Sequence, residues 1–400
     1  MIMNATTQDR DWTRLWLWLS MCGCLLFSLI SISLVEIFLG LGLVAWIIRL
    51  ALKKDRAFLP IFFWPLAAYA GLSLLSSAFS VDSWTSFKDC RDLLLFLAVP
   101  LAISAFSAVR PLRLGIFCLL FSAAVSCAYS FLQFARGGLP EKRVMGFMGH
   151  YMTQAGLLML FCLAALSLWL FLKEKIRWLW LAVLIPALAI LALTLTRSAW
   201  IGLLCGVCLL LGLYRPKLLV LVPVAAGLFF LAAPRTLKER ALSVFSLKDE
   251  SNIERLEYLR AGWKVIGLRP FLGTGPDTVD EEFNDPSLRL SPRAARNVHL
   301  HNNLVQIAAE RGIPAATAWL AFLVLAFLFA WRMFRRGDPW LKASAGASLA
   351  ALVGLFTAGF FEYNFGDSEI TILFLLLLAI PYGLAEGIRT GRRTPEAGSG

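Results

Sequence analysis

Long, uninterrupted runs of apolar residues restrict what this chain can fold into more than any other feature of its sequence. Twelve such runs are separated by short breaks that carry charge. A helix that crosses a bilayer needs about 20 mostly apolar residues, whereas a barrel strand alternates over about ten. Of the 400 residues, 59% are hydrophobic and 16% are charged, against about 25% charged in soluble domains. The sequence therefore predicts an all-α polytopic membrane protein, and it excludes a soluble enzyme and a disordered chain.

One long polar segment interrupts the series of predicted spans. Residues 234–312 hold 12 basic and 11 acidic residues, and they divide the chain into nine spans in 1–233, a large loop in 234–312, and three spans with a polar tail in 313–400. The expected spans cover residues 12–31, 33–52, 58–80, 92–109, 112–135, 150–172, 177–196, 198–214, 217–233, 313–334, 340–360 and 367–386.

Basic residues gather on one side of these spans. Loops after even-numbered spans and the two termini carry 20 Lys and Arg residues, against six in the short loops of the other side. Because Lys and Arg stay on the cytoplasmic side, both termini are expected in the cytoplasm and 234–312 outside. The net charge of +12 then reflects contact with membrane lipids. Nucleic-acid binding is not expected, because no basic reading motif is present.

Within the external segment, residues 255–268 have the pattern of an amphipathic helix that lies along the membrane surface. The apolar stripe consists of Leu256, Leu259, Trp263 and Ile266, and the polar side of Glu257, Arg260 and Lys264. Gly273-Thr274-Gly275-Pro276 predicts a turn. A second helix is expected to start near His301 and to run into the tenth span, with Gly312 and Pro314 at the join.

Three basic residues that are far apart in sequence share the outward side. A guanidinium binds phosphate through two parallel hydrogen bonds and stays charged, so Arg197 and Arg255 are candidates to hold a diphosphate. A neutral imidazole can take a proton from a sugar hydroxyl, so His301 is a candidate general base. The alternatives are arginines that extend to water or pair with Glu254 or Glu257, and a structural, hydrogen-bonded histidine.

No metal or cofactor site is expected. His299 and His301 do not share a helix face, and no third ligand is obvious beside them. The acidic run Asp280-Glu281-Glu282 is interpreted as a solvated face instead of a divalent-ion site. The eight cysteines lie mostly within apolar runs without His or acidic neighbours, so they are expected to be inert packing residues.

Four short motifs follow one another on the expected outward side. They are Thr196-Arg197-Ser198; Arg255 with Leu259 four residues later; Pro270-x-x-Gly273-x-Gly275; and His301-Asn302-Asn303-Leu304 with Glu310-Arg311-Gly312. Together they resemble the motifs of the O-antigen ligase/polymerase family. The loop from Arg143 to Gly149 is also similar, although His150 stands where Asn is commoner. Two positions depart mildly from the family pattern: Ala315 stands where a further small residue or Tyr usually follows, and Gly202 lies one place later than the usual glycine.

The resemblance implies a glycosyltransferase in the inner membrane of a Gram-negative bacterium, with its active site on the periplasmic side. The donor would be O-antigen glycan on undecaprenyl pyrophosphate, and the acceptor a sugar hydroxyl of lipid A–core. The transfer would need no cofactor or metal and would invert the anomeric carbon. His301 would be the general base, and Arg197 and Arg255 would bind the diphosphate. Further candidates for the same cavity are Arg143, His150, His299, Arg260, Asn302 and Glu362.

Two alternatives stay open at this stage. An O-antigen polymerase or a bacterial O-oligosaccharyltransferase of the same family would share the chemistry and differ in its acceptor. A transporter for a lipid-linked glycan would belong to a different class, and it would need ionisable residues near the middle of the membrane. Glu36 is the only clear acidic candidate within a span, and it lies near the end of that span, which favours the enzyme.

Overall fold

The computed structural model describes residues 11–56, 58–137, 143–175, 177–246, 248–288 and 290–391. In this part of the chain every regular element is a helix, which confirms the predicted all-α class. The α-helices are α1 (Trp12–Phe27), α2 (Ile32–Ala51), α3 (Phe63–Ala78), α4 (Ser83–Asp89), α5 (Ala98–Ala105), α6 (Val109–Gly137), α7 (Tyr151–Phe171), α8 (Arg177–Leu193), α9 (Arg197–Tyr214), α10 (Leu221–Ala232), α11 (Arg235–Leu242), α12 (Glu250–Leu268), α13 (Asn303–Phe334), α14 (Pro339–Ala358) and α15 (Ser368–Arg389). Short 3₁₀ helices connect them: η1 (Cys90–Leu97), η2 (Gly146–Met148), η3 (Pro216–Val220), η4 (Ser243–Phe245), η5 (Val279–Asn284), η6 (Pro286–Leu288) and η7 (Ala294–Arg296).

All twelve expected spans fall on helical segments, but the helices differ in length. Within the described residues, seven are long and apolar enough to cross a membrane by themselves: α2, α6, α7, α9, α13, α14 and α15. The other five expected spans fall on the shorter helices α1, α3, η1–α5, α8 and η3–α10. The structure thus confirms a polytopic helical membrane protein, while the number twelve and the division of the chain at residues 233 and 312 stay predictions.

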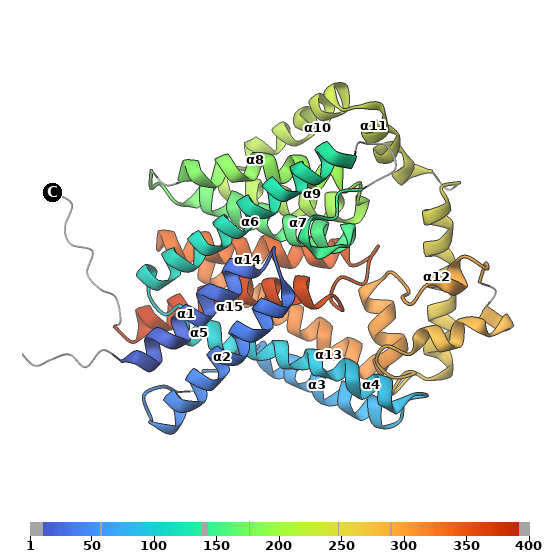
Figure 1. Ribbon diagram of the computed structural model, residues 1–400, viewed down its shortest axis with the longest axis horizontal. Helices are drawn as coiled ribbons and strands as arrows, with labels where there is room; N and C mark the ends of the chain where they lie inside the picture. Colours follow the sequence, from blue (N-terminus) through green and yellow to red (C-terminus); the bar gives the residue numbers. More distant parts are fainter. Residues whose placement is uncertain are drawn as a thin grey trace, which may run out of the picture.

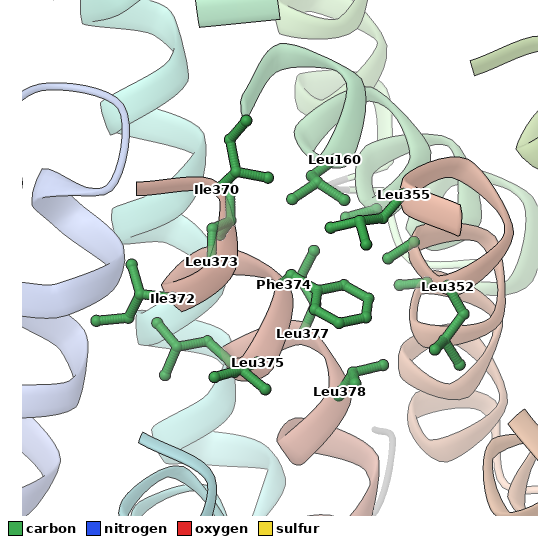
Figure 2. Close-up of a cluster of buried hydrophobic side chains, with 14 of the residues drawn as sticks. Leu160, Leu352, Leu355, Ile370, Ile372, Leu373, Phe374, Leu375, Leu377 and Leu378 are labelled. Atoms are coloured by element: carbon green, nitrogen blue, oxygen red, sulfur yellow. The ribbon is translucent and has the colours of Figure 1, made fainter. Parts of the chain in front are cut away.

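The centre of the bundle is α15, flanked by α7 and α14. In the most apolar window of α15, 94% of the residues are buried, against 33% in α2 and in α9. Phe374 and Leu377 of α15 lie in one cluster with Leu352 and Leu355 of α14 (Figure 2). A helix that is apolar on every side belongs in a protein core, whereas the less buried helices leave apolar sides for lipid. The central helices therefore provide a rigid base for the loops at their ends.

Small residues allow α9 and α14 to pack closely. A Cβ atom added at Gly202 would lie 2.5 Å from the carbonyl oxygen of Gly354, and one at Gly206 would lie 3.1 Å from that of Ala350. Close backbone approach between small residues is a common way for membrane helices to associate. The contact anchors α9, and with it Arg197 at its first turn, against the centre of the bundle.

Helix α12 lies across one end of the bundle, roughly perpendicular to the other helices (Figure 1). It begins at Glu250, earlier than expected, and it packs on α13, with Gly262 close to Val305; Tyr258, Ala261 and Val265 of α12 are buried. The expected apolar stripe is not the packing face, because Leu256, Leu259 and Trp263 are exposed and only Ile266 is buried. The exposed part of the stripe is consistent with a helix that rests on a membrane surface.

Helix α13 is kinked at Gly312, where the sequence predicted the join with the tenth span. Gly312 has φ 83°, and Pro314 lacks the N–H that would otherwise bond to the carbonyl of Glu310. The loop 270–275 replaces the lost partners. Gly275 N donates to Glu310 O at 2.9 Å, Thr274 N to Ala309 O at 3.0 Å, and Ile313 N to Pro270 O at 2.8 Å. The Pro-x-x-Gly-x-Gly motif therefore supports the kink that holds the start of α13 in place.

Candidate active site

His301 and Glu362 form a hydrogen-bonded pair between two loops. His301 precedes α13, and Glu362 lies in the loop between α14 and α15. Nδ1 of His301 is 3.0 Å from Oε1 and 3.2 Å from Oε2 of Glu362, and both side chains are largely buried. Burial raises the pKa of Glu362, but the opposing effects of His301 and Arg255 are together larger. The pKa of Glu362 therefore lies below its usual value. Glu362 is therefore a carboxylate that accepts a hydrogen bond from the imidazole.

The other nitrogen of His301 has a neutral partner. Its Nε2 atom lies 2.7 Å from Nδ2 of Asn297, which also donates to the hydroxyl of Tyr258 at 3.2 Å. An amide nitrogen can only donate, so Nε2 accepts, and the proton of the neutral ring is assigned to Nδ1, facing Glu362. The tautomer follows from this network. The basic lone pair on Nε2 thus points away from the carboxylate.

The backbone of His301 is strained. Its φ is 50°, in the left-handed region that costs a non-glycine residue energy and that often occurs at functional sites. Asn302, the next residue, caps α13 by accepting a hydrogen bond from Val305 N at 3.1 Å. The cap fixes the start of the helix, and the unusual turn before it directs the ring towards the loop of Glu362. Asn302 therefore has a structural function here.

Arg255 reaches the same loop from α12. Its Nε atom donates to the carbonyl oxygen of Phe361 at 3.1 Å, one residue before Glu362. Burial lowers the pKa of Arg255, and the negative charge of Glu362 opposes that shift. The structure therefore brings two of the predicted site residues, Arg255 and His301, to the loop that carries Glu362.

Arg197 is buried, and its guanidinium already has several partners. It donates to Ser243 Oγ at 2.8 Å, to Asp249 Oδ1 at 3.0 Å and to Asn252 Oδ1 at 2.9 Å, and it also contacts Ser251. These partners surround the start of α12. Arg197 thus joins the first turn of α9 to the helix that carries Arg255.

Four arginines act on one another near this site. Burial and the charges of Arg197, Arg143 and Arg255 lower the pKa of Arg240 to about 10. Arg240 donates to the carbonyl oxygen of Leu195 at 3.1 Å. The local potential is positive, because the nearby carboxylates of Asp249 and Glu362 are fewer than the arginines. Sequence reasoning missed Arg240, which belongs to no motif.

The remaining candidates differ in their surroundings. Arg143 stacks over the ring of Tyr151, with its guanidinium carbon 4.3 Å from the ring centre. His150 is exposed, and its Nδ1 lies 3.4 Å from the hydroxyl of Thr153. His299 packs against the ring of Tyr363 at 5.4 Å, and burial lowers its pKa. Arg260 is exposed on α12 and makes no hydrogen bond or ion pair with the residues that the structure describes.

A second network, which the sequence did not indicate, supports the loop of Glu362. Arg311 is buried and donates to Asp89 Oδ2 at 2.7 Å and to the hydroxyl of Tyr363 at 3.1 Å. It also pairs with Glu310 at 2.5 Å. These contacts join α4, α13 and the loop that holds Glu362. Three elements distant in sequence therefore position the carboxylate.

The acidic run 280–282 lies outside these networks. Glu282 pairs with Arg269 at 3.5 Å, and Glu281 is exposed. Within the described part of the chain, no group of three or more His, Cys, Asp or Glu side chains is placed to hold a metal ion. The run has the surroundings of a partly solvated face.

Fold and site together define a polytopic helical membrane protein with a histidine–carboxylate pair beside a cluster of arginines. Residues 182–320 match the family model described as O-antigen ligase, and the match confirms the resemblance seen in the motifs. The matched segment includes Arg197, Arg255 and His301. It supports a function of the O-antigen ligase or polymerase type, in which a membrane enzyme transfers glycosyl groups. No similar sequence is found among curated proteins.

Proposed function

We propose that this protein transfers an O-antigen glycan from undecaprenyl pyrophosphate to a sugar hydroxyl of lipid A–core. The observation that carries the proposal is the convergence of His301 and Arg255 on the loop of Glu362, in a chain whose residues 182–320 match the O-antigen ligase family model. A base beside a cationic group is what glycosyl transfer from a diphosphate requires. The base activates the acceptor hydroxyl, and the cations stabilise the leaving diphosphate.

In this proposal His301 is the general base. Nε2 takes the proton of the acceptor hydroxyl as its oxygen attacks the anomeric carbon of the donor. The bond between that carbon and the diphosphate oxygen breaks, its electron pair leaves with the diphosphate, and the anomeric carbon is inverted. Glu362 stabilises the imidazolium that forms, because its carboxylate is 3.0 Å from Nδ1. Glu362 is therefore a positioning residue, which acts through His301.

The amide of Asn297 indicates where the acceptor hydroxyl would sit. Its nitrogen is 2.7 Å from Nε2 of His301 and donates a hydrogen bond to it. A substrate hydroxyl in general-base catalysis makes the same kind of contact, at about 2.6–3.2 Å. The acceptor would thus displace Asn297 from the base, while the hydroxyl of Tyr258 stays bound to the carbonyl of Ala294 at 3.2 Å.

Arg255 and Arg197 would bind the diphosphate in different ways. Arg255 is half-buried and has one backbone acceptor at 3.1 Å, so it can contact the donor directly. Arg197 must first exchange its contacts with Asp249 and Ser251. Arg143 and Arg240 add positive potential, which favours the doubly charged leaving group. His150, His299, Arg260 and Asn302 would not contact the reacting atoms.

The proposed topology follows the distribution of Lys and Arg. Both termini would lie in the cytoplasm and the site in the periplasm of the bacterial inner membrane. No nucleotide is available there, and a lipid-linked donor is already activated. Transfer would accordingly need neither a cofactor nor a metal.

The proposal is tested with purified protein, lipid-linked glycan and lipid A–core in proteoliposomes. We expect a glycan–core product that withstands EDTA and disappears in His301→Ala. Product that EDTA removes and a divalent ion restores would contradict the metal-free reaction. Movement of the glycan across the bilayer without a new glycosidic bond would identify a transporter instead.

The identity of the acceptor distinguishes a ligase from a polymerase and from an O-oligosaccharyltransferase, which share its chemistry. A strain that lacks a ligase accumulates lipid-linked polymer and keeps bare core, so we expect this pattern on deletion. Core that carries a single repeat would identify a polymerase. Glycan transferred to a protein hydroxyl would identify an O-oligosaccharyltransferase.

A further inference from the structure

A cavity lies at the opposite end of the bundle from His301. It has a volume of about 1040 Å³, and Phe171 at the end of α7 and Ile388 at the end of α15 line it. Helix α15 begins just after the loop of Glu362 and runs for 22 residues, which is about 33 Å at 1.5 Å per residue. The cavity is therefore a separate site, which the glycosyl transfer does not use.

The walls of this cavity are mainly apolar. Leu172, Pro339 and Leu384 contribute side chains together with Phe171 and Ile388. The apolar part of the wall suits acyl chains, and an ion would find partners only where the charged side chains of the cavity lie. The volume is at the upper end of the range of about 300–1,000 Å³ that is usual for ligand pockets.

One polar wall is held together by its own contacts. Arg113 pairs with Glu174 at 2.7 Å and lies over the ring of Trp340, 5.1 Å from its centre. The indole nitrogen of Trp340 donates to the same carboxylate at 3.1 Å. Because both groups hold Glu174, its negative charge is compensated within the wall.

Two further cations lie at the same cavity, which Asp338 also lines. Arg110 and Lys173 are exposed, they line the cavity, and neither forms an ion pair with any residue in the described ranges. Both belong to the loops whose Lys and Arg content predicts the cytoplasmic side. The cytoplasmic leaflet is rich in anionic lipids, and basic pockets between membrane helices on that side bind their headgroups.

We propose that this cavity binds one anionic phospholipid of the cytoplasmic leaflet. Arg110 and Lys173 contact the phosphate, and the glycerol and the upper acyl chains lie against Phe171, Leu384 and Ile388. The ring of Trp340 lies at the level of the headgroup, where amphipathic aromatic side chains are favoured. The bound lipid bridges α6, α7, α14 and α15, and it stabilises the central helices at the end opposite to the active site.

The test compares lipid binding to the full-length protein in detergent. Wild-type protein is exchanged from mixed micelles that contain phosphatidylglycerol or phosphatidylcholine, and retained lipid is counted by native mass spectrometry. We expect retention of phosphatidylglycerol only, and an increase in the thermal unfolding temperature with this lipid only. The double variant Arg110→Gln/Lys173→Gln should bind it about tenfold or more weakly, because each basic residue near an anionic headgroup contributes substantially.

A matched control changes the same charge elsewhere on the same side. Arg335 and Arg336 are exposed, lie in the loop after α13 and do not line the cavity, so Arg335→Gln/Arg336→Gln should keep wild-type binding. Ile388→Trp, which fills the cavity without a change of charge, should weaken binding. Equal loss in the control pair, unchanged binding in the cavity variants, or equally tight binding of glycerol phosphate without acyl chains would each overturn the proposal. Glycan transfer is not the readout, so failure here leaves the proposed function untouched.

Discussion

Nδ1 of His301 lies 3.0 Å from Oε1 of Glu362, although 61 residues separate the two in sequence. The contact joins the loop before α13 to the loop before α15. It holds the imidazole with the lone pair of Nε2 directed away from the carboxylate, towards Asn297, and it places a negative charge where a protonated ring would need one. The pair also explains why the strained backbone of His301 is retained, since the turn is what directs the ring to the carboxylate.

Substitution of His301 should lower the rate of transfer more than substitution of Glu362. We expect His301→Ala to lower the rate of transfer by about 10²–10⁴-fold, as for other general bases. Glu362→Gln keeps the shape of the side chain and loses its charge, so the fall should be smaller and should lie in kcat, with the donor KM nearly unchanged. Steady-state kinetics in proteoliposomes measure both. Equal donor KM increases in the two variants would place them in donor binding instead.

Acid should remove the stability that Glu362 contributes. The pKa of Glu362 lies below its usual value of 4.5 in the folded protein, so its ionised form stabilises the fold at pH values above 4.5. This contribution is lost as the pH falls through the lowered pKa. We expect wild-type protein to unfold at a higher temperature than Glu362→Gln near neutral pH, and the difference to shrink in acid. The exposed Glu281→Gln should show no such pH-dependent difference.

Loss of the Arg255 guanidinium should weaken use of the donor. Arg255→Ala should raise the donor KM much more than the acceptor KM, and Arg255→Lys should recover little, because an ammonium cannot make two parallel hydrogen bonds to phosphate. Arg269→Ala, at the end of the same helix, removes an equal charge whose partner is Glu282. It should retain normal kinetics. Normal rates in Arg255→Lys would reduce the role of Arg255 to bulk charge.

Arg197 and Asp249 should be coupled. If Arg197 exchanges its 3.0 Å contact with Asp249 for the donor, Asp249→Asn removes a competing anion and should lower the donor KM. Arg197→Ala should raise it, and the double variant should resemble Arg197→Ala alone. Thermal unfolding of the same proteins measures how much the contacts of Arg197 at the start of α12 contribute to stability. Additive effects of the two substitutions on the donor KM would contradict the proposed exchange of Asp249 for the donor, and Arg197 would then be a structural residue.

The glycines of the 270–275 loop should be needed for stability. Gly273 has φ 69°, and a Cβ atom there would lie 2.3 Å from the backbone of Glu310. We expect Gly273→Ala to destabilise the protein by about 1–3 kcal/mol, because strain at a positive φ is added to the clash. Gly267 in α12 has no neighbour within 4 Å of such an atom, so Gly267→Ala should be neutral or stabilising. Thermal unfolding compares the two, and equal destabilisation would contradict the supporting role of the loop.

Periodicity predicted the class of the fold but not the direction of every face. In α12 the stripe of Leu256, Leu259 and Trp263 has the pattern of an interfacial helix face, and it is exposed, while Tyr258 and Ala261 on another side of the helix are buried in the protein. Two faces of one helix can be apolar when one meets protein and the other meets lipid. Periodicity alone does not distinguish them.

The sequence by itself determined the helical membrane class, the join at Gly312 and Pro314, and the motifs that contain Arg197, Arg255 and His301. These follow from local properties: lengths of apolar runs, the missing N–H of Pro314, and residue types at short spacings. Only the tertiary structure decided that Glu362 meets His301, that Asp249 holds Arg197, and that Arg240 joins the cluster. The His301–Glu362 and Arg197–Asp249 contacts link residues 61 and 52 positions apart in sequence, and their geometry is set by how α12, α13 and α15 pack, which no local pattern encodes.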